Sequence, residues 1–142
     1  MPSQNYSDTF YFALVSFLLQ AKQQVVATSG SLGLTGIQAL TLLMVDTIEA
    51  PSMSRICKLY DCDASNITGI IDGLEQKGLV SRQPHPNDRR VKVIRLETAG
   101  KKMQAKVIHR LAETSDHLFS GLDSQEREQF EGLIKKLAPY KR

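Results

Sequence analysis

Apolar residues recur at helical spacing along most of the chain and are separated by short polar segments. The first such segment follows Ser7, a residue type that caps helices, and runs to about residue 28. Its apolar positions fall on two faces, so the pattern predicts a helix that other elements cover on two sides. The segment 29–33, with two serines and two glycines, is predicted to end this helix.

Two shorter helices are predicted next. Thr35 and Gln38 have the spacing of a capping box, and apolar residues follow at helical spacing. Pro51 and Ser52 then open a short third helix that carries Met53 among its apolar residues.

A fourth helix is predicted directly after a tight break at Asp61, a residue type that tolerates the left-handed conformation. Asp63 is expected to cap it, and Lys77 followed by Gly78 ends it, as is typical of helix C-termini. The third and fourth helices, joined by so short a break, have the spacing of a helix-turn-helix.

A hairpin and two more helices complete the predicted order. Segments 79–82 and 91–96 alternate imperfectly between apolar and polar residues and predict two strands joined by a long, proline-containing loop. Thr98 is expected to cap a long helix that runs to about residue 120, and Asp123 with Glu126 marks the last helix. The fold class is therefore mainly α with a small β-hairpin wing, in one domain over residues 1–142.

Composition narrows the class of protein. The chain has 142 residues, a formal net charge of +3 and a pI near 8.9, which is compatible with a polyanionic partner. No apolar run is long enough to span a membrane, and the polar residues 5–8 precede the first apolar run where a secretory signal would be positive. Two cysteines five residues apart, Cys57 and Cys62, are no disulfide framework, so a reduced cytoplasmic setting is expected.

The sequence contains no recognisable catalytic motif. It contains no glycine-rich phosphate loop, nucleophile elbow or paired-carboxylate pattern, so we expect no enzyme and no cofactor. His109 and His117 are eight residues apart, too far for the spacing of two zinc ligands on one helix, and no metal site is expected.

The outer face of the fourth helix is polar at its start. With Ile67 and its apolar companions toward the core, the outward residues near the helix start are Ser65, Asn66, Thr68 and Gly69. Short hydrogen-bonding side chains at a helix start suit contacts to base edges and phosphates. Such residues also favour helix ends for local reasons alone, and only the surrounding helix-turn-helix pattern favours DNA binding.

The loop of the hairpin is rich in cations. Arg89 and Arg90 follow Asp88 at its tip, and arginine suits insertion into a narrow minor groove. Asp88 could orient Arg90 through a bidentate pair; the alternative is an ordinary surface ion pair that contributes about 0–1 kcal/mol. Around this loop Asp88 appears as the one acid facing the basic residues, an excess that favours phosphate contact. These basic residues are Arg82, Arg89, Arg90, Lys92 and Arg95.

The run SNITGIIDGLEQKGLVSRQPHPNDRRVKVIRLETAGKK, residues 65–102, closely resembles the MarR family of winged helix-turn-helix transcription regulators. The resemblance implies a homodimer that binds pseudo-palindromic operators. It implies a DNA-binding lobe at 34–100, dimerisation helices in 1–29 and 101–142, and commonly a small aromatic or phenolic effector. By the same resemblance the fourth helix enters the major groove, Arg90 enters the minor groove and Asp88 orients it.

Two departures from the family pattern affect the expected mechanism. Gly69 and Gly73 stand where relatives often carry arginine, the residue of the commonest specific contact to guanine. Either Gly69 lets the helix backbone approach the groove closely, or the protein depends more on its wing and on DNA shape. We favour the second, so replacing Arg90 should weaken binding more than replacing Asn66.

The sequence thus predicts a sequence-specific regulator that binds double-stranded DNA, most simply a ligand-responsive homodimeric repressor. An architectural DNA-binding protein without an effector is one alternative. A cysteine-based redox sensor is a second and weaker one, because Cys57 and Cys62 occupy positions where small apolar residues are usual. A winged helix used for protein contact would not need a basic wing tip.

Overall fold

The structure is a computed structural model that describes residues 9–138. It contains six α-helices, one short 3₁₀ helix and one antiparallel hairpin, which confirms the predicted fold class. The elements in chain order are α1 (Phe10–Ser31), α2 (Gly36–Met44), η2 (Val45–Thr47), α3 (Met53–Tyr60), α4 (Ala64–Gln76), β1 (Val80–Pro84), β2 (Lys92–Leu96), α5 (Thr98–Thr114) and α6 (Ser124–Leu137).

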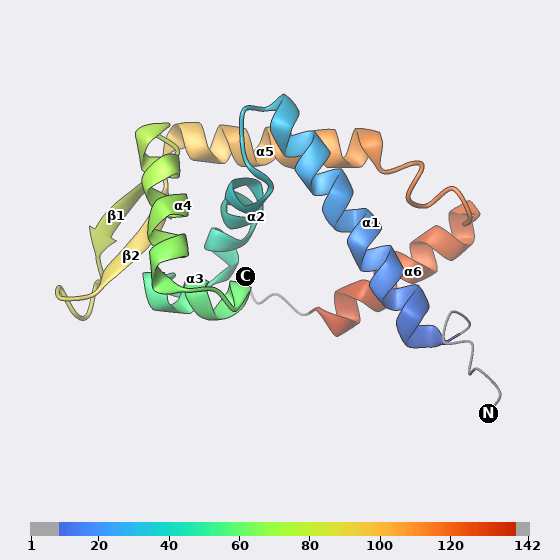
Figure 1. The fold of residues 1–142 in the computed structure, drawn as a ribbon, viewed down its shortest axis with the longest axis horizontal. Helices are drawn as coiled ribbons and strands as arrows, with labels where there is room; N and C mark the ends of the chain where they lie inside the picture. The colour runs from blue at the N-terminus through green and yellow to red at the C-terminus, as the bar shows by residue number, and fades with distance from the viewer. Residues whose placement is uncertain (1–8, 139–142) are drawn as a thin grey trace.

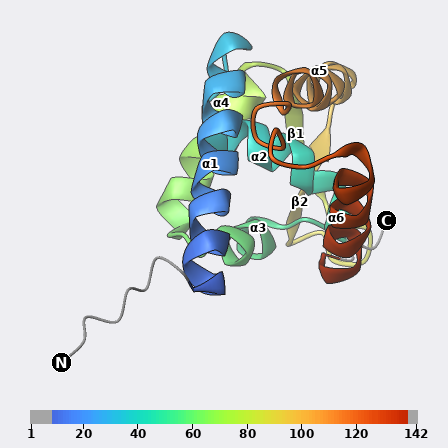
Figure 2. The same cartoon turned by 90° about the vertical axis from the view of Figure 1, so that its right-hand side faces the viewer.

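The molecule is elongated, with different elements at its two ends (Figure 1). The hairpin and α4 lie at one end, α1 and α6 lie at the other, and α5 runs along the molecule between them. Viewed from the α6 end, α1 and α6 lie in front of the remaining elements (Figure 2). The helix α5 therefore connects the winged lobe to the region of the two terminal helices.

One hydrophobic core lies inside the winged lobe. Its side chains come from α2, α3, α4, the hairpin and α5, and each large aliphatic side chain that is fully buried contributes about 1.5–3 kcal/mol. The helix α1 buries only the polar residues Gln24, Thr28 and Ser29. No residue of α6, which is described over its full length, is buried. The largest fully buried aliphatic side chains are Leu42, Val45, Ile56, Ile67, Ile71, Leu74, Val93, Ile94 and Val107.

Several helix ends follow the local signals in the sequence. The Thr35 hydroxyl accepts from the Gln38 amide at 3.2 Å, and the Gln38 side chain accepts from the Thr35 amide at 3.1 Å, so the capping box is confirmed. The capping box of Asp123 and Glu126 is confirmed in the same way. The predicted stop at Gly78 has φ +68°, which glycine adopts at little cost.

Other predicted helix ends are wrong. Ser7 lies outside the described residues; the cap of α1 is Thr9, and the helix continues to Ser31 because packing against the lobe overrides the local break. Thr98 is the first helical residue of α5 and not its cap, which is Glu97. The helix also ends at Thr114, earlier than expected.

The early end of α5 has a local cause, and the predicted cap of α4 also differs from the expectation. After Thr114 the chain turns, and the Ser115 hydroxyl donates to the carbonyl of Ala112 at 3.0 Å, a bond that competes with continuation of the helix. Asp63 does precede α4, but within the described chain its side chain makes no capping hydrogen bond.

The hairpin is anchored to the start of α3. Its strands pair in antiparallel register from Val80 opposite Leu96 to Pro84 opposite Lys92, within one or two residues of the predicted bounds. The segment before α3 adds a further contact, because the Ile94 amide donates to the Pro51 carbonyl at 2.9 Å. The strand β2 is thus bonded to β1 and to the segment before α3, and the loop of the hairpin extends beyond these bonds.

The apolar content of the helices in residues 9–138 bears on whether any of them could span a membrane. Within this range no single helix is both long and apolar enough to cross a bilayer. The pair formed by Phe10–Ser31 and Gly36–Thr47 reaches the required length and composition only in combination, with a bend of 98° between its members.

Candidate nucleic-acid interface

The first candidate surface is the outer face of α4. Ile67, Ile71 and Leu74 anchor this helix in the core. On the opposite face the predicted residues Ser65, Asn66, Thr68 and Gly69 are all exposed, as expected. The Thr68 hydroxyl donates to the carbonyl of Ala64 at 2.9 Å, so part of its hydrogen-bonding capacity is used within the helix.

The two glycines of α4 have different surroundings. A Cβ atom on Gly69 would meet no atom of the described residues within 4 Å, so this position faces open space. A Cβ atom on Gly73 would lie 2.6 Å from Nε2 of Gln38, whose side chain is engaged in the cap of α2. Position 73 therefore packs against α2, and glycine there has a structural reason that glycine at 69 lacks.

The second candidate surface is the tip of the hairpin. The Arg90 side chain is 95% exposed. Asp88 accepts a hydrogen bond from the backbone amide of Arg90 at 3.1 Å, while its Oδ1 lies 3.8 Å from Nε of Arg90. The predicted bidentate pair is therefore wrong, because Asp88 mainly holds the turn backbone and leaves the guanidinium in solvent.

Arg82 has a different environment from the other basic residues of the hairpin. Its guanidinium contacts Asp72 at 2.6 Å and also contacts Glu75, and its amide donates to Glu75 at 3.0 Å. The interpretation that Asp88 is the one acid facing these arginines is therefore wrong for Arg82. The structure gives Arg82 the role of tying β1 to α4. The missed signal was an acidic pair three residues apart on the face of the preceding helix.

The remaining cations of the hairpin are exposed. Arg89, Arg90, Lys92 and Arg95 all face solvent, and among residues 9–138 Asp88 is the acid that pairs with one of them. This local positive charge lies at the same end of the molecule as α4 (Figure 1). The arrangement can attract a polyanion, and the exposed guanidinium of Arg90 is free to enter a groove.

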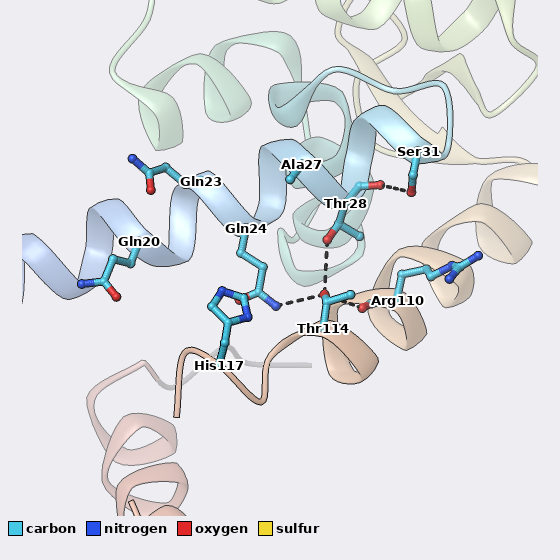
Figure 3. Close-up of a pocket in the computed structure, with 9 residues that line it drawn as sticks. All are labelled: Gln20, Gln23, Gln24, Ala27, Thr28, Ser31, Arg110, Thr114 and His117. Atoms are coloured by element: carbon cyan, nitrogen blue, oxygen red, sulfur yellow. Dashed lines mark hydrogen bonds between the residues drawn. The ribbon is translucent and has the colours of Figure 1, made fainter. Parts of the chain in front are cut away.

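A cavity of about 670 Å³ lies between α1 and the end of α5 (Figure 3). Gln24 crosses the space beside it and donates to Thr114 at 3.0 Å. This cavity was not predicted from the sequence, although three glutamines that interrupt the apolar pattern of the first helix were a usable signal. The lining residues are Gln20, Gln23, Gln24, Ala27, Thr28, Ser31, Arg110, Thr114 and His117.

A comparison with known families decides the class of the lobe. Residues 34–92, which include α2, α3, α4 and β1 and end at the first residue of β2, match the model described as the MarR family. Over these residues the winged helix-turn-helix lobe is similar to the MarR family. The resemblance seen in the sequence is confirmed, and transcription regulation through DNA is the function associated with this family.

Three relatives show how far the likeness to MarR proteins extends. YwhA of Bacillus subtilis (strain 168), an uncharacterised HTH-type transcriptional regulator, is 27% identical over 126 residues, or 89% of this chain and 90% of YwhA. The apo form of MarR from E. coli is 22% identical, with a TM-score of 0.80 over 92% of this chain and 97% of MarR. A mutant of that MarR was solved with operator DNA, at a TM-score of 0.70 and 21% identity over 96% and 100% of the two chains.

Besides YwhA and MarR, a further relative was solved with a small molecule. CouR from Rhodococcus jostii RHA1, bound to p-coumaroyl-CoA, is 24% identical, with a TM-score of 0.72 over 95% of each chain. At these identities the solved structures establish the fold alone. Because the likeness covers more than nine-tenths of the chain, the flanking helices α1, α5 and α6 share the arrangement seen in those structures.

Proposed function

We propose that this protein is a sequence-specific transcription regulator that binds double-stranded DNA as a homodimer and acts as a repressor. The main support is that two exposed features occur together: the polar start of α4 and the guanidinium of Arg90 at the hairpin tip. Nothing in this proposal requires enzymatic chemistry.

In the proposed complex, α4 lies in the major groove and the hairpin tip reaches the adjacent minor groove. Ser65 and Asn66 are exposed in the first turn of α4, the part of a recognition helix that contacts base edges. Arg90 enters the minor groove, where the negative potential of narrow A·T-rich segments favours arginine. Arg89, Lys92 and Arg95 contribute phosphate contacts. Arg82 instead stabilises the hairpin, because its contact with Asp72 joins β1 to α4.

A dimer is supported by the apolar surface of the terminal helices. Along α1, Tyr11 is 74% exposed and Leu18 is 56% exposed, and along α6 Leu137 is 81% exposed. Large exposed apolar patches on a protein mark contacts with other proteins. A second copy of this chain is the partner that the family fold favours, and two-fold symmetry then pairs two α4 helices with successive major grooves about 34 Å apart.

A small effector is supported by the cavity between α1 and α5. Its polar lining, with the guanidinium of Arg110 and several amides and hydroxyls, suits an aromatic or phenolic compound that carries an acidic group. The helix α5 continues from this cavity to the base of the hairpin, so a ligand there can change the spacing of the two lobes. Such a ligand weakens DNA binding only if it prefers the non-binding spacing.

Selection of bound duplexes from a random DNA pool tests the core of the proposal. We expect an inverted repeat whose half-sites are spaced by about one helical turn, 10–10.5 base pairs. The Arg90→Ala variant should retain little enrichment under the same salt. No enrichment by the unmodified protein would exclude sequence-specific binding. A thermal-shift screen with phenolic carboxylates, followed by binding to the selected duplex, then separates an effector-responsive regulator from one without an effector.

A further inference from the structure

The two cysteines lie in contact at the turn between α3 and α4. Their Sγ atoms are 3.9 Å apart. The helix end determines this contact: Asp61 has φ 47°, the Cys62 amide donates to the Cys57 carbonyl at 3.2 Å, and the Asp61 amide donates to Lys58 at 3.4 Å. This is the Schellman pattern, in which the side chains at the positions of Cys57 and Cys62 meet across the turn.

The pair is accessible to small molecules. Both cysteines are half-buried, and both line a cavity of about 530 Å³ that also touches Met53 and Thr68. Partial burial, together with the neighbouring Cys57 thiol and nearby carboxylates, raises the pKa of Cys62. The Cys57 thiol in turn donates a hydrogen bond to the Cys62 carbonyl, so the two side chains are held together across one turn.

We propose that Cys57 and Cys62 form a dithiol modification site that a peroxide converts into an intramolecular disulfide. One of the two cysteines, as its thiolate, attacks one oxygen of the peroxide ROOH, forming a sulfenic acid and releasing ROH once the proton is returned. The sulfur of the other cysteine then attacks the sulfenic sulfur, forming the S–S bond and releasing water. In total, two thiols lose two electrons and two protons, and the peroxide is reduced to ROH and water.

Closing this bond changes the geometry of the turn. A disulfide requires an S–S distance of about 2.05 Å, so the two sulfur atoms approach each other by roughly 1.9 Å from their present 3.9 Å. Cys62 lies next to Asp63, the N-cap position that directly precedes α4. Part of the movement is therefore expected to reach the first turn of α4, where Ser65 and Asn66 lie. This consequence for DNA rests on the proposed function, whereas formation of the bond does not.

Peptide mapping tests bond formation without any DNA. The protein is treated with hydrogen peroxide, alkylated and digested with trypsin under non-reducing conditions. Cleavage after Arg55, Lys58 and Lys77 separates Cys57, in peptide 56–58, from Cys62, in peptide 59–77. We expect a linked pair of these peptides that disappears with dithiothreitol and is absent from Cys57→Ser and Cys62→Ser. Recovery of both peptides separately alkylated, or of higher sulfur oxides alone, would overturn the proposal.

An isotope mixture distinguishes a bond within one chain from a bond between two chains. Equal amounts of ¹⁵N-labelled and unlabelled protein are unfolded, refolded together and then oxidised. An intramolecular bond gives linked peptides in which both members carry the same label. Linked peptides of mixed label, in the proportion expected for random pairing, would overturn the assignment to one chain.

Binding to a duplex selected from the random pool tests the consequence for DNA. At fixed salt we expect peroxide to weaken binding about tenfold, within the range that one mismatched base pair costs. Dithiothreitol should restore binding, and Cys62→Ser should be insensitive to peroxide. Linked peptides with unchanged affinity would overturn the regulatory consequence. If no duplex is selected at all, the proposed function fails while the peptide map still decides whether the bond forms.

Discussion

A Cβ atom on Gly100 would lie 1.9 Å from the carbonyl oxygen of Leu79. The same oxygen accepts a hydrogen bond from the Glu97 amide at 2.9 Å. The first turn of α5 is thus seated directly on the backbone that leads into β1, and a side chain at position 100 has no room. This contact joins the hairpin to the helix that extends toward α1 and α6.

Replacing Gly100 by alanine should therefore lower the free energy of unfolding. We expect a loss of roughly 2–4 kcal/mol, because backbone on both sides has to move, and urea denaturation at a fixed protein concentration measures it. The matched control is Gly69→Ala, also in a helix but facing open space, where alanine should add up to about 1 kcal/mol. Equal effects of the two substitutions would contradict the close contact with Leu79.

The contacts of Arg82 with Asp72 and Glu75 predict a structural effect. Arg82→Met should lower the free energy of unfolding by about 1 kcal/mol, a modest value because all three side chains are partly exposed. Arg89→Met is the matched control, since within residues 9–138 the structure shows no ion pair for Arg89, and its stability should stay within about 0.5 kcal/mol. Thermal denaturation of both variants decides whether Arg82 stabilises the wing.

The exposed guanidinium of Arg90 predicts a large effect on DNA binding. Arg90→Ala should weaken binding to the selected duplex about tenfold or more, within the range for a well-placed groove contact, and Asn66→Ala should weaken it less. If Arg90 also displaces one counterion, the slope of log K against log salt becomes less steep by about 0.9. Fluorescence anisotropy at several salt concentrations measures both quantities. A larger loss for Asn66→Ala would show that α4 dominates recognition.

The apolar surface of α1 predicts a change of oligomeric state. Leu18→Lys should shift the protein toward the monomer, because a charge would then be buried in the proposed dimer contact. Leu59→Lys is the matched control on α3, since Leu59 is 44% exposed and Leu18 is 56% exposed. Light scattering after size-exclusion chromatography measures the mass. A protein that is already monomeric without substitution, or a dimer unaffected by Leu18→Lys, would argue against this contact.

Signals that act within one helical turn were predicted well. The capping boxes of Thr35 with Gln38 and of Asp123 with Glu126 were confirmed, as was the left-handed stop at Gly78. Thr98 was predicted as a cap, but threonine also fits the first turn of a helix. The hydrogen bond from the Glu97 amide to the Leu79 carbonyl decides where α5 begins. The contact between Cys57 and Cys62 belongs to the same local class and could have been inferred from a left-handed Asp61.

Relations between elements could not be predicted in this way. Nothing local in the sequence indicates that Arg82 pairs with Asp72 and Glu75, since that contact depends on how β1 leaves α4. Nor does the sequence indicate that Gly73 faces Gln38 while Gly69 faces open space, because a glycine carries no apolar or polar signal of its own.

By itself, the sequence determined the order of the elements, the class of the lobe and the residues at the wing tip. Each of these depends on residue type and on spacings of a few positions, over which hydrogen bonds and helical periodicity act directly. The tertiary structure alone decided which cations remain exposed, which glycine has space for a side chain and where a cavity opens beside Gln24. Those features arise where separate elements pack together, and packing depends on the path of the whole chain.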